Sequence, residues 1–338
     1  MKRKMKILVI VVGLAIAILF IKNVLAAYFN RIDPVGKLYW LESNDQYDPE
    51  WELMVCDLAT QTTTPVAKLE KGYGYVLLQT DLPEIYLSKG TENGSICMLE
   101  VSQDGTIKES DKMETDLKIV QILARYQDRV YFIAVVGYQG ETEEKSTRLI
   151  RFGEYNVKTK KTKLIGEAFL WWDLMNTPTV SQDGKILYVK AQDYVYIDEE
   201  GKERVAYYQV CMAEGDSEKV LATGDRCVWY SDEEVLVKKT NERWGKVNVQ
   251  TGEVSELEDS TDNTSLAMGN SSSQAVVLSA DKRYIAYSAA KKSKWDIYPE
   301  VSANTCLRVR DIKTGKERVV AEENSSLNWI SGRTLLWR

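Results

Sequence analysis

The sequence contains no histidine among its 338 residues. Histidine is the commonest general base, a frequent zinc ligand and the partner that activates serine and cysteine nucleophiles. A G-x-S-x-G nucleophile elbow and a P-loop are also missing. An enzyme without these groups would depend on carboxylates or lysine. The sequence therefore predicts no catalytic residue, no cofactor and no metal site, and favours a non-catalytic protein.

Proline and phenylalanine are scarce, with 6 and 5 residues, whereas there are 19 tyrosines and 9 tryptophans. No long helical pattern follows residue 30, and Asn, Asp and Ser occupy the turns. Tyrosine and tryptophan suit half-buried strands, where the ring packs and the polar tip stays in water. Hydrophobic residues make up 44% of the chain, enough for a packed core. An all-β domain is expected.

Cysteine is also scarce, and the sequence contains no C-x-x-C pair of the kind that would suggest a metal or redox site. The five residues are Cys56, Cys97, Cys211, Cys227 and Cys306. Four of them are expected in the third strand of different structural units, too far apart to form disulfides. Buried free thiols are the favoured interpretation. A Cys211–Cys227 disulfide is the alternative.

The stretch Leu307–Val320 reads as a β-hairpin, because apolar and charged residues alternate on each side of Asp311-Ile312-Lys313-Thr314-Gly315. The Asp side chain can bond backbone groups two residues on, and the Gly can adopt a positive φ. The same turn recurs at Asn248–Gly252 and, with Lys in the Gly position, at Asn156–Lys160. Asp57–Gln61 is a weaker copy.

A second element recurs with a spacing typical of propeller blades. VSQDGKILYVKA starts at Val180, WYSDEEVLVKK at Trp229 and LSADKRYIAYSA at Leu278, so successive copies are 49 residues apart. Outer hairpins are expected at six places: Met54–Ala67, Ile96–Lys108, Leu149–Ile165, Tyr207–Leu221, Lys246–Leu257 and Leu307–Val320. These elements predict a six-bladed β-propeller of four-stranded blades, with seven blades as the fallback.

The two ends of this array should meet in one blade. Leu38–Leu41 begins one blade, and Leu327–Ile330 and Leu335–Trp337 supply inner strands at the other end of the chain. Pairing them would close the ring and protect its sheet edges. One inner strand is then surplus, which is the reason for the seven-bladed fallback.

The VSQDGKILYVKA and LSADKRYIAYSA blocks resemble the S-P-D-G-x-x-I-A-Y-type core of TolB-like, or WD40-like, β-propeller repeats. The paired DIKTG hairpin is similar to the outer hairpin of those blades. The resemblance covers about residues 36–338, although this chain lacks the Pro after Ser and has lost the Gly in most copies. It implies a fold used for binding, gating or scaffolding, and it transfers no catalytic residue.

The N-terminus predicts export. Lys2, Arg3, Lys4 and Lys6 precede the apolar run Ile7–Ile21, a charge order that keeps this end in the cytoplasm. An uncleaved anchor, with the membrane contact extended over residues 7–29, is preferred over a signal peptide cut after Ala26. We therefore expect a signal anchor or signal peptide at residues 1–30 and an extracytoplasmic propeller at residues 31–338.

The exported part is acidic. The net charge of the chain is −6, and without the five basic residues of the first 30 it becomes −11. This negative charge argues against nucleic acid as a partner, since phosphate binding needs basic groups. The sequence therefore predicts no nucleic-acid partner.

Trp171 and Trp172 are the candidate ligand-binding residues. Exposed paired rings would suit a sugar or peptide, whereas packing between blades is the competing and favoured interpretation. The function expected overall is a non-catalytic binding or scaffold domain for a protein or peptide partner at the cell envelope. The alternative is a carboxylate-based carbohydrate- or peptide-processing enzyme on the same scaffold.

Overall fold

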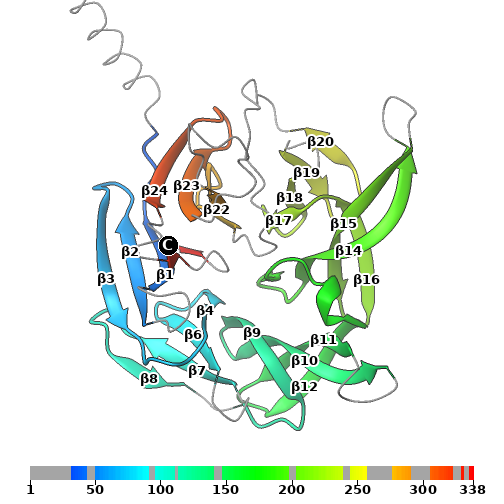
Figure 1. Cartoon of the computed structure of the whole chain (residues 1–338), viewed down its shortest axis with the longest axis horizontal. Helices are drawn as coiled ribbons and strands as arrows, with labels where there is room; N and C mark the ends of the chain where they lie inside the picture. Colours follow the sequence, from blue (N-terminus) through cyan, green and yellow to red (C-terminus); the bar gives the residue numbers. More distant parts are fainter. Residues whose placement is uncertain are drawn as a thin grey trace, which may run out of the picture.

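The computed structural model describes residues 32–43, 50–90, 96–110, 113–140, 147–197, 203–238, 244–256, 276–290, 305–322, 329–330 and 335–338. Within them, six sheets stand around a central axis as the blades of a propeller (Figure 1). The predicted six-bladed fold is therefore confirmed, and the seven-bladed fallback is wrong. The expected anchor lies outside the described residues. Among those described, no helix has the length and apolar character needed to span a membrane.

Each blade has four antiparallel strands, counted here from the axis outwards. Blade 1 contains β25 (Trp329–Ile330) with β26 (Leu336–Trp337), β1 (Lys37–Ser43), β2 (Trp51–Asp57) and β3 (Thr62–Lys68). Blade 2 contains β4 (Tyr75–Leu77), β6 (Ile85–Gly90), β7 (Ile96–Val101) and β8 (Ile107–Glu109). Blade 3 contains β9 (Lys118–Tyr126), β10 (Arg129–Gln139), β11 (Thr147–Asn156) and β12 (Lys161–Leu170). Blade 4 contains β13 (Thr179–Val180), β14 (Ile186–Ile197), β15 (Glu203–Glu214) and β16 (Ser217–Thr223). Blade 5 contains β17 (Arg226–Trp229), β18 (Glu234–Lys238), β19 (Trp244–Asn248) and β20 (Val254–Glu256). Blade 6 contains β21 (Val276–Leu278), β22 (Tyr284–Ala290), β23 (Thr305–Asp311) and β24 (Glu317–Glu322).

The antiparallel order gives the ring two different faces. Turns between the first and second strands, and between the third and fourth, lie on one face, which we call the tight-turn face. Connections between the second and third strands, and from one blade to the next, begin and end on the opposite face. We call this the long-connection face, because strands that are far apart in the sequence, such as β20 and β21 or β22 and β23, follow one another there.

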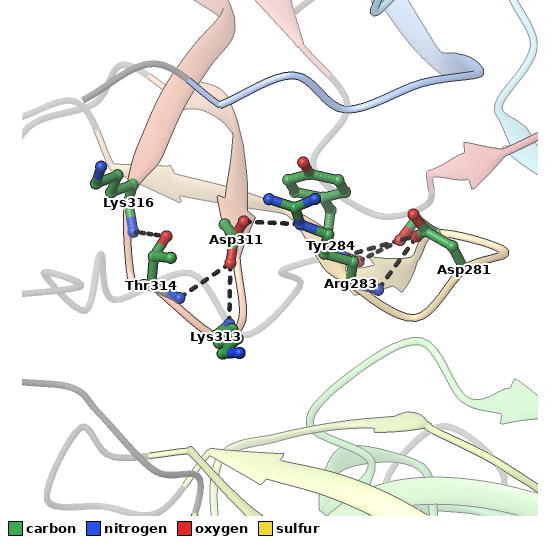
Figure 2. Close-up of polar contacts among 8 residues, drawn as sticks. Asp281, Arg283, Tyr284, Asp311, Lys313, Thr314 and Lys316 are labelled. Carbon is green, nitrogen blue, oxygen red and sulfur yellow. Dashed lines mark hydrogen bonds and ion pairs between the residues drawn. The ribbon is translucent and has the colours of Figure 1, made fainter. Parts of the chain in front are cut away.

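The outer turns form as the sequence predicts. Asp311 Oδ1 accepts hydrogen bonds from the amides of Lys313 at 3.0 Å and Thr314 at 2.9 Å (Figure 2). The equivalent bonds recur at Asp57, Asn156 and Asn248. The fifth position of the four turns has a positive φ at Gln61, Lys160, Gly252 and Gly315. The turn is thus set by the first side chain, and glycine at the fifth position is favourable without being required.

The inner turns also repeat. Ser181 Oγ donates to Asp183 Oδ1 and accepts from the amide of Lys185, which closes the turn between β13 and β14. Ser279 makes the same contacts with Asp281 and Tyr284 in blade 6. These bonds hold a tight turn without the proline that TolB-like repeats carry after the serine.

The ring closes in blade 1, as predicted. Leu38 pairs with Trp337, and Ser43 pairs with Trp329, so β26 and β25 lie one after the other along β1. The apparent surplus strand is therefore one interrupted innermost strand. Trp337 fixes the join: its ring is 8% exposed and stacks on Tyr284 of blade 6, and its Nε1 donates to Val35 O at 3.0 Å.

The core is divided into apolar layers between successive blades, including one between blade 6 and blade 1. Cys56, Cys97, Cys211 and Cys306 lie in third strands as expected, and all five cysteines are free thiols. The alternative Cys211–Cys227 disulfide is absent from these described strands. The reason is that Cys211 faces blade 3, whereas Cys227 packs between blades 4 and 5.

One strand departs from the regular pattern. β5 (Gln79–Thr80) leaves blade 2 and pairs in parallel with β9, on the axial side of blade 3. The Gln79 side chain then accepts a hydrogen bond from the amide of Val180 in blade 4 at 2.9 Å. Tyr126 donates to the carbonyl of the same Val180 at 2.8 Å. The inner strands of three blades are therefore tied together by backbone and side-chain bonds.

Candidate binding surface

Trp171 and Trp172 form most of a single 3-10 turn, η2 (Trp171–Asp173), between β12 and β13. This turn belongs to the long-connection face. The two residues are 37% and 61% exposed, which places them outside the buried apolar layers between the blades. The exposure leaves their proposed role in ligand binding untested.

The neighbouring residues explain why the two rings stay outside. Leu174 forms a backbone bridge with Lys190, and the amide of Met175 donates to Val189 O at 2.9 Å. Leu174 packs against the apolar layer between blades 3 and 4, and Met175 against the layer between blades 4 and 5. The interior positions are therefore filled by Leu174 and Met175, and the tryptophans are held outside on a pinned turn.

Two further apolar side chains are exposed at the same end of blade 3. Val136 is 38% exposed and stands at a bulge in β10, and Tyr138 is 42% exposed two residues later. We call Val136, Tyr138, Trp171 and Trp172 the blade 3 rim. Together they make up half of the large hydrophobic side chains exposed among the described residues. Grouped apolar and aromatic exposure of this kind marks interaction surfaces.

The chemistry available beside the rim is limited. Burial raises the pKa of Asp173, and the positive charge of Lys190 opposes this shift. The turn η2 carries a single carboxyl group, that of Asp173, and no group of three potential metal ligands occurs among the described residues. Acid–base catalysis by two carboxylates needs their pKa values to be moved apart. The rim therefore offers contact area more than reactive groups.

A cavity of about 840 Å³ lies on the tight-turn face between blades 1 and 2. It opens where β5 swings away from blade 2. Its walls combine apolar residues, among them Val55, Val66 and Ile85, with the polar residues Asp104 and Arg338. Its size is within the range of small-molecule sites.

Two charged groups of this cavity, those of Arg338 and Asp104, have partners within the chain. The Arg338 guanidinium donates to the carbonyls of Leu82, Pro83 and Glu84. Asp104 accepts from the amide of Thr106 at 3.0 Å, a bond that lowers the pKa of Asp104. The Arg338 contacts join blades 1 and 2, and both charged groups are already engaged, which makes the cavity a weaker candidate than the rim.

Sequence reasoning missed one polar cluster. Arg226 and Lys238 are 5% and 0% exposed, although single basic residues at strand ends are normally placed in solvent. The signal that could have identified them is the register of β17 and β18, which places the two residues opposite each other.

The fold and this surface define a six-bladed β-propeller that presents an aromatic rim at one face. No protein-family model matches the sequence, and no curated protein sequence matches it either. Among solved structures, TolB from Acinetobacter baumannii matches 89% of this chain with a TM-score of 0.50 and 13% identity. A putative TolB from Agrobacterium tumefaciens matches 90% of it, with a TM-score of 0.45 and 10% identity. A third match, an oligogalacturonate lyase in complex with manganese, covers 81% with a TM-score of 0.41 and 13% identity.

The match to the Acinetobacter TolB supports a TolB-like propeller fold. The chain spans 66% of the Acinetobacter TolB, 99% of the Agrobacterium protein and 71% of the lyase. At such low identity the likeness concerns the fold alone, and the function has to be argued from the residues of this chain.

Proposed function

We propose that this protein is an exported, membrane-anchored β-propeller that binds a protein or peptide partner at the cell envelope without catalysing a reaction. The observation that carries the proposal is the pair Trp171 and Trp172, exposed on a turn whose following residues are bonded to β14. Because that backbone is already ordered, a partner would lose little conformational entropy on docking there. The anchor itself is proposed from the basic and apolar order of residues 2–29.

The composition of the rim favours a polypeptide partner. Tryptophan and tyrosine are the side chains that most often dominate binding energy at protein interfaces. Val136 and Tyr138, exposed at the same end of blade 3, would add further contact area for a polypeptide. The carboxylate-based enzyme is the weaker alternative, because the turn that carries the two tryptophans has one carboxyl group, Asp173, and an acid–base pair needs two.

The experiment changes Trp171 and Trp172 together to Ala in the full chain. Protoplasts are treated with a membrane-impermeant cross-linker, and the captured partner is identified by mass spectrometry. We expect the double variant to lose the partner that the wild type captures, with Tm unchanged. Val220→Ala with Val319→Ala is the matched control, since these side chains are 50% and 41% exposed on other blades. Partner capture by the tryptophan variant at the wild-type level would refute the rim as the docking site.

Localisation is tested in the same cells. Protease added to intact protoplasts should digest the propeller while cytosolic marker proteins stay whole. Protection of the propeller would overturn export. Mass measurement of the native N-terminus separates a retained anchor from a cleaved signal peptide.

A further inference from the structure

Two junctions between neighbouring blades are bridged by a cationic side chain. Lys219 of β16 donates from Nζ to the carbonyls of Val249 at 2.7 Å and Gln250 at 3.0 Å, in the outer turn of blade 5. Arg318 of β24 donates to Leu58 O at 3.0 Å, in the outer turn of blade 1. Both cations belong to a fourth strand, and their long apolar stems span the gap to the next blade. The chain therefore closes these two junctions with a cation of its own on the tight-turn face.

A threonine stands at the corresponding place in blade 1. In blade 6, Arg318 pairs with Val309, two residues before the third strand ends at the outer turn. Lys219 holds the same place in blade 4. In blade 1, the residue two positions before the end of β2 is Val55, and its partner is Thr64. Threonine is too short to reach the next blade, so Thr64 supplies no such bridge between blades 1 and 2.

The outer turn of blade 2 contains the residue that would accept such a bond. The amide of Gly105 donates to Ser102 O at 3.0 Å and closes this turn, as an equivalent bond closes the outer turn of blade 5. Gln103 follows Ser102 and therefore corresponds to Val249, whose carbonyl is bound at the junction with blade 4. Gln103 and Thr64 both line the cavity of about 840 Å³ described above. The cavity thus lies at the junction that Thr64 leaves without a cation.

The walls of this cavity suit an apolar stem. Tyr39, Val55 and Thr64 lie directly opposite one another in the register of blade 1, and residues placed in this way project to the same side of a sheet. All three line the cavity. Ile85 and Val101, which are buried, line it from blade 2. Apolar and aromatic side chains therefore bound the cavity on both sides.

The two cations of the cavity already have anions near them. The hydrogen bond from the Thr60 amide and, to a smaller extent, the charge of Lys37 lower the pKa of Asp57. Burial lowers the pKa of Arg338, and the negative charge of Glu84 opposes this shift. The guanidinium of Arg338 also donates to three backbone carbonyls. Neither cation therefore needs an anionic ligand.

The two carboxylates of the cavity are bonded to neutral donors. Asp104 accepts from the amide of Thr106 at 3.0 Å, and Asp81 accepts from the amide of Gln127 at 3.3 Å. An amide donor leaves the negative charge of a carboxylate in place. The bond from Thr106 lowers the pKa of Asp104, which keeps this group ionised. The cavity therefore favours a cationic ligand over an anionic one.

We propose that this cavity binds a guanidinium or ammonium group on an apolar stem, in the place that Arg318 and Lys219 hold at the two bridged junctions. The cationic head binds the Gln103 carbonyl and the Asp104 carboxylate, and the stem lies against Val55. The assignment goes beyond the proposed function, because the cavity opens on the tight-turn face and the blade 3 rim lies on the other face. A free small cation and a lysine or arginine side chain of a polypeptide share this chemistry.

The test measures the Kd of small probes for the full chain by isothermal titration calorimetry at constant ionic strength. The probes are n-butylguanidinium chloride, n-butylurea, which has the same shape without the charge, and acetyl-alanyl-arginyl-alanine amide. We expect n-butylguanidinium to bind at least about tenfold more tightly than n-butylurea. Tighter binding of the peptide than of n-butylguanidinium assigns the site to a polypeptide side chain, and weaker binding assigns it to a free small cation.

Three variants locate the bound probe. Thr64→Arg supplies the cation from within the chain and should abolish n-butylguanidinium binding without lowering Tm. Thr63→Arg is the matched control, because Thr63 precedes it in β3 and projects to the other side of the sheet, so binding should be retained. Asp104→Asn keeps an acceptor for the Thr106 amide and should weaken binding about threefold.

The assignment is overturned if the wild type binds none of the probes, or binds n-butylguanidinium and n-butylurea equally. Retained binding in Thr64→Arg, loss of binding in both arginine variants, or unchanged binding in Asp104→Asn would also overturn it. If Thr64→Arg does not fold, the charge comparison and Asp104→Asn still decide the question. Because the probes need no cellular partner, failure here leaves the tryptophan cross-linking result unaffected.

Discussion

Arg283 Nε donates to Asp311 Oδ2 at 3.0 Å and thereby links the inner turn of blade 6 to its outer turn (Figure 2). Asp311 is 1% exposed, and its other oxygen accepts the two amides of its own turn. The arginine side chain is 59% exposed, and its hydrogen bond to Asp311 raises the pKa of Arg283. The Asp311 carboxylate thus stabilises its own turn and also links this turn to the inner turn of the blade.

The two tasks can be separated by substitution at Asp311. Asp311→Ala should lower the free energy of unfolding by about 2–3 kcal/mol, because two turn amides lose their acceptor in a buried place. Asp311→Asn should cost about 1 kcal/mol or less, since the side-chain oxygens of Asn156 and Asn248 accept the same turn hydrogen bonds. Arg283→Ala should also cost under about 1 kcal/mol, as exposed ion pairs do. Urea denaturation measures all three, and equal losses for Ala and Asn would contradict this division.

Closure of the ring depends on Trp337. Trp337→Ala removes a buried ring that stacks on Tyr284 and should lower the free energy of unfolding by about 3–5 kcal/mol. Trp172→Ala, at an exposed position, should change it by no more than about 0.5 kcal/mol. A chain truncated after Glu322 should aggregate, because the edge of β1 loses its partners. If the truncated chain melted like the wild type, the pairing of β1 with the C-terminal strands would be disproved.

The five thiols should react unequally. Burial raises the pKa of Cys211 to about 12 and raises that of Cys227 still further, so neither is a thiolate at pH 8. Cys97 is partly exposed, although burial also raises its pKa. Iodoacetamide at pH 8 should therefore modify Cys97 first in the folded protein and all five after unfolding, as followed by mass spectrometry. Cys97→Ser should abolish the early reaction; fast labelling of Cys211 or Cys227 would be incompatible with the packing described.

Much of the architecture was predictable because each repeated turn uses local chemistry. The side chain of Asp311 or Ser279 bonds to backbone atoms only a few residues away, so the pattern is visible in a single sequence. Six outer hairpins and the meeting of Leu38 with Trp337 followed from counting these turns.

The missing parts depend on choices between distant partners. Leu174 and Met175 compete with Trp171 and Trp172 for the same interior space, and all four are apolar. The hydrophobic periodicity of the sequence cannot decide which of these four residues are buried. The parallel pairing of β5 involves only two residues, too short for any strand signal. The placement of Arg226 opposite Lys238 depends on strand register, which a sequence pattern leaves open.

The pairing of Leu38 with Trp337 also has a consequence for biogenesis. Synthesis produces β1 before any other strand of the propeller, whereas its inner partners follow last. An exposed strand edge must therefore persist while five further blades are made. Such widely separated contacts slow folding and prolong the period in which a chain can associate with its neighbours. The yield of folded protein should consequently depend on how quickly the C-terminal strands pair with β1. Chaperones that shield strand edges should raise this yield.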